Sequence, residues 1–267
     1  MLRTLYYALP PAWRFLARRL YYLPFDYYEG LTGRRDPLTP PRGLIYTGSG
    51  DFKAHGEKML SYFIELSGLQ PHCRVLDVGS GIGRIAVPLT RYLSRQGSYE
   101  GFDVVELGVR WCQKQISARF PNFRFQYVEL DNDLYKSGGG NAAAFTFPYP
   151  DADFDLVVLI SVFTHLLPEE TANYLREIAR VLRPGGRCFG TFFLWDEEAA
   201  ALAGAQPDFS FPYDRGSYRL MDERVQAANV AYEEAHLRQM IAGAGLQTEA
   251  VYRGYWPGRN KGECRDF

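Results

Sequence analysis

Arg74-Val75-Leu76-Asp77-Val78-Gly79-Ser80-Gly81-Ile82-Gly83-Arg84 is the stretch of sequence that decides the fold. Its first half is mostly apolar, and its second half has glycine at three alternate positions. A short apolar run ahead of a glycine-rich turn is typical of a buried parallel strand, and the apolar residues after the turn predict a helix. Because glycine is favoured where a ligand lies against the main chain, this strand-turn-helix unit predicts a ligand-binding turn.

The residues around the glycines indicate which kind of ligand the turn accepts. A dinucleotide fingerprint has glycines at the first, third and sixth positions of G-x-G-x-x-G/A. Here the sixth position is Arg84, and the third glycine, Gly83, comes one position early. Asp77 lies two residues before the first glycine, where its carboxylate would repel a phosphate and suit a cation. A protein with the dinucleotide fingerprint would be an NAD-dependent oxidoreductase, and these two departures disfavour that function.

The rest of the chain predicts strands and helices in alternation. Strands are expected at residues 73–78, 98–102, 123–128, 154–160, 187–194 and 246–252. Helices are expected at residues 51–69, 85–94, 109–120 and 168–182, with an irregularity at Pro88. This alternation predicts an α/β fold with a doubly wound, mainly parallel sheet covered by helices on both faces.

Length and composition limit the kinds of protein that this chain can be. Its 267 residues are enough for one large α/β domain with a substantial core. The net charge of -1 offers no positive excess to attract nucleic acid. The four cysteines include no C-x-x-C pair, and the four histidines have no metal-ligand spacing. We therefore expect a cytoplasmic protein with reduced thiols, no bound metal and no nucleic-acid partner.

Two segments lie outside the alternating pattern. Residues 1–50 read as an N-terminal extension with a short, basic amphipathic helix at residues 12–23, which is too short and too charged to span a bilayer. This helix either packs on the domain or makes peripheral contact with a membrane surface. Residues 195–230 lose periodicity and contain two prolines, two tyrosines and Gly216, which predicts a lid insertion.

Several motifs together resemble one protein family. The run Asp77-Val78-Gly79-Ser80-Gly81-Ile82-Gly83, the acid Asp103 twenty residues later, the strand at 154–157 and the turn at 183–186 resemble successive motifs of the class I S-adenosylmethionine-dependent methyltransferases. Residues 45–52 and 161–166 are similar to a bacterial branch of undefined substrate. The resemblance implies a Rossmann-like sheet in residues 51–267. Ser80 replaces a cysteine common in that branch, and Glu129 stands where aspartate is more usual.

The resemblance also has a consequence for the end of the sheet. The family ends with an antiparallel strand inserted beside the sixth strand, and this sequence stops where that strand should begin. We therefore expect either a sheet that lacks its last strand or an N-terminal segment that compensates for it.

The resemblance implies S-adenosylmethionine as the cofactor and assigns residues to it. Asp77 would act on the methionine amino group through water or backbone, the glycines would give the ligand clearance, and Asp103 would accept both ribose hydroxyls. Glu129 and Leu130 would meet the adenine. The cofactor-binding residues implied are Asp77, Gly79, Ser80, Gly81, Gly83, Asp103, Val104, Glu129, Leu130 and Ser161.

The reaction implied is methyl transfer to a small-molecule, glycan-linked or lipid-linked acceptor, with oxygen as the preferred acceptor atom. Such a transfer needs a general base only if the acceptor is a hydroxyl of high pKa. The candidates for this base are His165 and Glu170, which follow the fourth predicted strand. A non-catalytic binding subunit with the same fold is a further alternative, against which the intact pair Asp77 and Asp103 argues.

Overall fold

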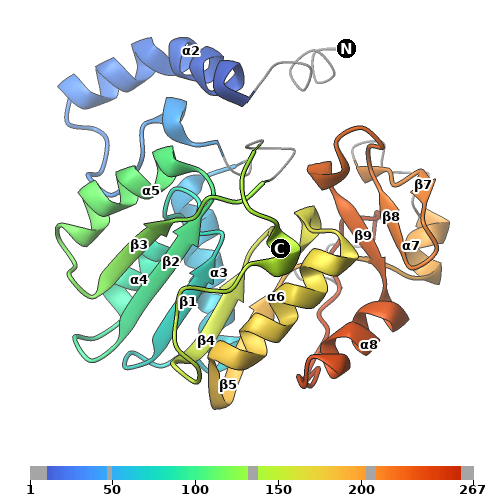
Figure 1. Cartoon of the computed structure of the whole chain (residues 1–267). Helices are drawn as coiled ribbons and strands as arrows, with labels where there is room; N and C mark the ends of the chain where they lie inside the picture. The colour runs from blue at the N-terminus through green and yellow to red at the C-terminus, as the bar shows by residue number, and fades with distance from the viewer. Residues whose placement is uncertain (1–10, 47–49, 132–137, 203–208, 260–267) are drawn as a thin grey trace. The chain divides into compact units, whose positions relative to one another are not determined.

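The computed structural model describes residues 11–46, 50–131, 138–202 and 209–259. The chain divides into two compact units, Met1–Glu129 and Leu130–Phe267, which we describe separately (Figure 1).

The first unit begins with a helix that is longer than predicted. Helix α2 spans Pro11–Leu31 and contacts the short 3-10 helix η1, Arg42–Leu44. The carboxylate of Asp26 accepts hydrogen bonds from the backbone N–H groups of Arg42 and Gly43, at 2.6 and 2.9 Å. Asp26 thereby fastens η1 to the side of α2.

Two further helices lie on either side of the first strand in sequence. Helix α3, Phe52–Ser67, is capped at its N-terminus by Asp51, whose carboxylate accepts from the N–H of Ala54 at 2.8 Å. Helix α4 spans Ala86–Tyr92. The irregularity predicted at Pro88 is not found, because Pro88 lies in the first turn of α4. Backbone N–H groups in the first turn make no hydrogen bond within the helix, so a proline there removes none.

Three parallel strands form the sheet of the first unit. They are β1 Arg74–Val78, β2 Ser98–Asp103 and β3 Phe123–Tyr127, in the order β3-β2-β1. Helix α5, Glu106–Cys112, follows β2 and continues as a π-helical segment, η2 Gln113–Ser117. The predicted strands are confirmed to within about one residue. Since the strands are parallel, their carboxyl ends share one edge and bring the glycine turn close to Asp103.

The second unit contains another parallel pair, β4 Phe154–Leu159 and β5 Leu182–Gly190, joined by the 3-10 helix η4 Phe163–His165 and helix α6 Pro168–Val181. The predicted start of the fifth strand, at residue 187, is wrong. The strand begins directly after α6 and accommodates Pro184-Gly185-Gly186 as a bulge: Leu182 pairs with Phe154, whereas Arg187 pairs with Leu156. A 3-10 turn, η3 Ala142–Ala144, precedes β4.

The chain after β5 forms a second, small sheet with the strand order β6-β9-β8-β7. Its strands are β6 Phe193–Trp195, β7 Tyr213–Asp214, β8 Tyr218–Leu220 and β9 Val230–Glu233; the helical segments are α7 Glu197–Leu202, η7 Gln226–Ala228 and α8 Glu234–Gly243. The segment predicted to be a lid, 195–230, thus contains short regular elements. Its role as a lid stays a prediction.

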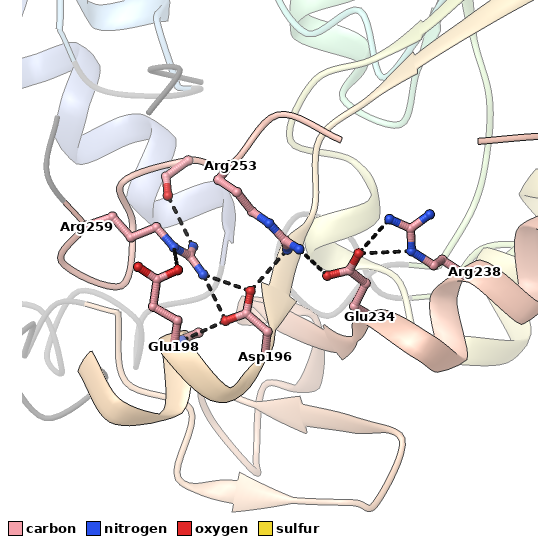
Figure 2. A network of polar contacts seen from close by, with 8 residues as sticks. Asp196, Glu198, Glu234, Arg238, Arg253 and Arg259 are labelled. Carbon is pink, nitrogen blue, oxygen red and sulfur yellow. Dashed lines mark hydrogen bonds and ion pairs between the residues drawn. The ribbon is translucent and has the colours of Figure 1, made fainter. Parts of the chain in front are cut away.

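The strand predicted at 246–252 is wrong, because these residues are irregular and mostly exposed. In the part of the chain that the structure describes, no strand follows β9, and residues 260–267 lie outside that part. Side-chain contacts hold the irregular segment instead (Figure 2). Arg253 pairs with Asp196 and Glu234, and Trp256 packs into an aromatic cluster with Phe193, Trp195, Phe209 and Phe211.

The most buried member of this charged network is Arg259. Its guanidinium donates to both carboxylate oxygens of Asp196 at 2.8 Å and to Glu198 at 2.6 Å. We predict that Arg259→Met lowers the free energy of unfolding by about 1.5–3 kcal/mol, because it removes charge-assisted bonds. Urea denaturation measures this, with Arg238→Met as the control at the exposed end of the network. Equal losses in the two variants would contradict the prediction.

Candidate cofactor site

The glycine turn has a backbone that requires glycine. Gly79, Gly81 and Gly83 have φ angles of 77°, 55° and 78°, in the left-handed region that other residues rarely adopt. The N–H groups of Gly79 and Ser80 donate to the carbonyl oxygen of Phe102 at 2.9 and 3.0 Å, which fixes the turn to the end of β2. The turn is therefore a rigid backbone feature rather than a loose loop.

Close packing adds a second requirement for glycine around the turn. A Cβ atom on Gly83 would lie 2.8 Å from the side chain of Ile116 and 2.9 Å from the sulfur of Cys112. A Cβ atom on Gly108, in α5, would lie 2.4 Å from the carbonyl oxygen of Gly81. Packing against α5 and η2 thus favours glycine at position 83, in addition to the left-handed φ angle.

Asp103 holds the turn from the end of β2. Its Oδ2 accepts from the N–H of Gly81 and its Oδ1 from the N–H of Val105, both at 2.8 Å. Burial raises the pKa of Asp103 to about 6, although these backbone hydrogen bonds act in the opposite direction. Because each carboxylate oxygen has further lone pairs, Asp103 can organise the turn and still accept hydroxyl groups from a ligand.

Asp77 is buried at the end of β1 and has one partner that the sequence did not reveal. The hydroxyl of Tyr99, on β2, donates to its Oδ2 at 2.5 Å, and the Tyr99 ring stacks on Phe123. Burial raises the pKa of Asp77 to about 7; the Tyr99 bond lowers it, and the charge of Asp103 raises it further. The contact follows from the register, in which Tyr99 pairs with Val75.

These features fit a ligand such as S-adenosylmethionine. Among the described residues no positive charge lowers the pKa values of the buried carboxylates Asp77 and Asp103, so a cation would stabilise their ionised forms. The hydroxyl of Ser80 is buried with no hydrogen-bond partner among the described residues. The Ser80 side chain lies against Gly101. The turn therefore offers negative charge and a glycine-rich backbone to a ligand that carries a cation and hydroxyls.

The other residues predicted for the cofactor are spread over both units. In the first unit, half-buried Val104 follows β2 directly and exposed Glu129 follows β3, so both lie at the same sheet edge as Asp77 and Asp103. Leu130 and Ser161 belong to the second unit. Ser161 follows β4 with a φ of 58°, and its N–H donates to the hydroxyl of Thr191 at 2.8 Å. Strained backbone of this kind often occurs at functional sites.

The two candidate bases in the second unit have different surroundings. His165 Nδ1 lies 2.8 Å from the carbonyl oxygen of Ala227, so Nδ1 carries the proton and donates it. Burial lowers the pKa of His165, which favours the neutral ring. The carboxylate of Glu170 accepts from the backbone N–H of Leu167 at 2.7 Å and caps α6. The carboxylate of Glu170 thus stabilises the start of α6, whereas neutral His165 has an unprotonated Nε2 that can accept a proton. His165 is therefore the better candidate for a base.

Burial of Asp77 has a measurable cost. Its pKa is raised on folding, so the folded chain holds more protons than the unfolded chain between about pH 4 and pH 7, and stability falls as the pH rises through that window. We predict that Asp77→Asn raises the free energy of unfolding at about pH 8 by roughly 1–4 kcal/mol, while the difference shrinks near pH 5. Thermal unfolding at the two pH values tests this, with exposed Asp222→Asn as the control. A variant no more stable than the parent at pH 8 would contradict it.

Comparisons with known proteins point in one direction. Residues 76–190 match a family model described as a methyltransferase domain. The ubiquinone/menaquinone biosynthesis C-methyltransferase UbiE of Azotobacter vinelandii is 26% identical over 197 residues, which cover 70% of this chain and 70% of that protein. The 27-O-demethylrifamycin SV methyltransferase of Amycolatopsis mediterranei is 31% identical over 181 residues, which cover 67% of this chain and 55% of that protein.

A solved structure has the same fold. The PH0226 protein from Pyrococcus horikoshii OT3 aligns with a TM-score of 0.52 at 16% identity, covering 79% of this chain and 88% of that one. At this identity the likeness shows the fold alone, and it confirms the predicted mainly parallel sheet with flanking helices. The relatives matched by sequence are enzymes that transfer methyl groups, which decides against the NAD-dependent oxidoreductase and the non-catalytic subunit.

Proposed function

We propose that this chain, which belongs to the class I S-adenosylmethionine-dependent methyltransferases, holds its cofactor at the glycine turn of residues 79–83 and methylates a small-molecule or lipid-linked acceptor. The observation that carries the proposal is the pair of buried carboxylates, Asp77 and Asp103, on either side of a left-handed glycine turn. The site is assigned to the domain at 51–267, with 195–230 as its lid.

The residues of the first unit divide the task of binding. Asp103 accepts hydroxyl groups while it keeps Gly81 in place, and the charge of Asp77 attracts the amino group. Glu129, with Leu130, is assigned to the adenine, and Val104 and Ser161 are proposed as further cofactor-binding residues. When bound, S-adenosylmethionine supplies a methyl group on a positively charged sulfur. Holding an acceptor in line with that group can contribute about 7–11 kcal/mol to catalysis.

The acceptor atom in our proposal is oxygen. The relative of higher identity, whose name specifies a 27-O-demethyl substrate, favours oxygen, and a neutral His165 can take a proton from a hydroxyl. The C-methyltransferase relative favours carbon as the second candidate. The test is to measure release of S-adenosylhomocysteine with phenols, hydroquinones and their O-methylated analogues. If an analogue whose hydroxyl is blocked by a methyl group is turned over as fast as the free phenol, the oxygen of that hydroxyl is not the acceptor atom.

We predict a loss of rate without loss of cofactor affinity when His165 is replaced. In His165→Asn the amide can still donate to Ala227, but the accepting Nε2 is gone, so turnover of a hydroxyl acceptor should fall by about 10²–10⁴-fold. Calorimetry should give an unchanged affinity for S-adenosylmethionine. A turnover rate equal to that of the parent between about pH 6 and pH 9 would remove His165 as the base, and Glu170 would be replaced next.

The proposal extends to partners and location. We assign no nucleic-acid partner to the chain and place it in the cytoplasm, in keeping with its net charge of -1 and with the free thiols of the three described cysteines, Cys73, Cys112 and Cys188. We also propose peripheral contact with a membrane through residues 12–23. No helix among the described residues is long and apolar enough to cross a membrane.

A further inference from the structure

Helix α2 carries an exposed apolar face along its whole length. Nine of the twelve large apolar side chains that are exposed among the described residues belong to this one helix: Trp13, Leu16, Leu20, Tyr21, Leu23, Phe25, Tyr27, Tyr28 and Leu31. Trp13 is 61% exposed and Leu31 is 70% exposed. A surface helix normally turns such residues toward the core, and a contiguous exposed apolar patch marks an interaction site.

The acids of α2 lie on the opposite side. Asp26 accepts from the backbone at η1, and the carboxylate of Glu29 pairs with Arg42 at 2.6 Å. The period of 3.6 residues per turn places Leu20 and Leu31 opposite Glu29. The acids of α2 therefore bind the neighbouring segment that contains η1, and the apolar residues point away from that segment.

Basic and aromatic groups border the apolar face. Of the five arginines in residues 11–35, Arg14 is buried and Arg35 pairs with Asp26, which leaves Arg18, Arg19 and Arg34. The guanidinium of Arg18 lies 5.0 Å from the centre of the Tyr22 ring, and that of Arg34 lies 5.4 Å from the Tyr28 ring. An apolar face rich in Trp, Tyr and Leu, bordered by arginines, is the composition of a helix that binds an anionic membrane surface.

We propose that α2 docks the protein on an anionic membrane, lying in the plane of the interface with its apolar face in the boundary between headgroups and acyl chains. A helix of 21 residues is about 30 Å long, so the contact extends well past residue 23 to Leu31. The inference deepens the membrane contact proposed above for residues 12–23, and it rests on the proposed methyltransferase function only where it locates a lipid-linked acceptor at that membrane. The docking itself needs no cofactor.

A second copy of the chain fits this face less well than a lipid surface does. In a symmetric dimer the same helix lies on both sides of the interface. Both copies would bring the arginines that border the face, Arg18 and Arg34, to one interface, because these side chains lie over Tyr22 and Tyr28. Asp26 and Glu29 face η1 and would not offset these like charges.

The test is co-sedimentation of the full chain with vesicles of phosphatidylcholine alone or mixed with phosphatidylglycerol. We expect binding to the mixed vesicles that weakens as salt is added. Leu20→Glu and Leu31→Glu should each reduce this binding by about tenfold or more, because an exposed anchor is replaced by a charge of the wrong sign. Ile64→Glu, which changes an exposed apolar residue of α3, is the matched control and should bind as the parent does.

Calorimetric titration with S-adenosylmethionine on the same samples separates the two proposals. Normal cofactor affinity in all three variants shows that the fold is intact. If the parent does not bind the cofactor, the proposed function is contradicted, whereas the docking proposal is still decided by vesicle binding. The docking proposal is overturned if the parent binds neither vesicle, or if the α2 variants bind as the parent does. A parent dimer in sedimentation velocity that Leu20→Glu dissociates, without vesicle binding, would assign the face to a second copy.

Discussion

Asp103→Asn should weaken the binding of S-adenosylmethionine by two to four orders of magnitude. A carboxylate that accepts two hydroxyls makes two charge-assisted hydrogen bonds of about 1.5–3 kcal/mol each, and each 1.4 kcal/mol is tenfold in affinity. Asparagine is the better replacement than alanine, because it keeps the size of the side chain and one acceptor oxygen, and so one of the two bonds from the N–H groups of Gly81 and Val105. An alanine variant would lose both of these bonds together with the ligand contact.

The matched control for this variant is Asp222→Asn. Asp222 also accepts from two backbone N–H groups close by in sequence, those of Arg224 and Val225, but it lies in an exposed loop of the second unit. It should leave the affinity unchanged. If calorimetry gives Asp103→Asn the affinity of the parent, Asp103 does not contact the ligand.

Gly81→Val should abolish measurable cofactor binding, whereas Ser80→Cys should be tolerated. At a φ of 55° a β-branched side chain is strained, and the N–H of Gly81 would lose its bond to Asp103 if the turn moved. The cysteine variant keeps a small side chain and leaves the backbone unchanged. Protection against thermal unfolding by added S-adenosylmethionine measures both variants.

Gly33→Val separates backbone strain from loss of the site. Gly33 has a φ of 65° in the same unit, and nothing lies within 4 Å of the place where its Cβ would be. Both valine variants should be destabilised by strain, but Gly33→Val should still respond to the cofactor. A cofactor response retained by Gly81→Val would mean that the ligand does not lie against this turn.

The parts of the fold that the sequence predicts well are those whose signals are local. Strands β1 and β4 are largely apolar runs bounded by turns, and β2 and β3 are short segments with aromatic residues. The structure places all four within about one residue of their predicted limits. The residues predicted at the ends of β1 and β2 do meet, because parallel pairing brings Asp103 to the N–H of Gly81.

The parts that the sequence predicts poorly depend on distant contacts. The bulge at Pro184 is set by pairing with β4. The segment predicted as a strand at 246–252 is irregular, and Arg253, directly after it, forms ion pairs with Asp196 and Glu234. The hydroxyl of Tyr99 meets Asp77 only through the strand register. Periodicity identifies the apolar stripe of α2, but it cannot tell whether that stripe faces the core or the exterior.

The most direct test of the central claim is a thermal-shift measurement on the parent chain with S-adenosylmethionine, S-adenosylhomocysteine and NAD. At a hundred times its dissociation constant a ligand stabilises the folded state by about 2.7 kcal/mol, which gives a clear rise in Tm. We expect this rise with S-adenosylmethionine and with S-adenosylhomocysteine, and no rise with NAD. A rise with NAD alone, or no rise with S-adenosylmethionine, would contradict the assignment of the glycine turn to this cofactor.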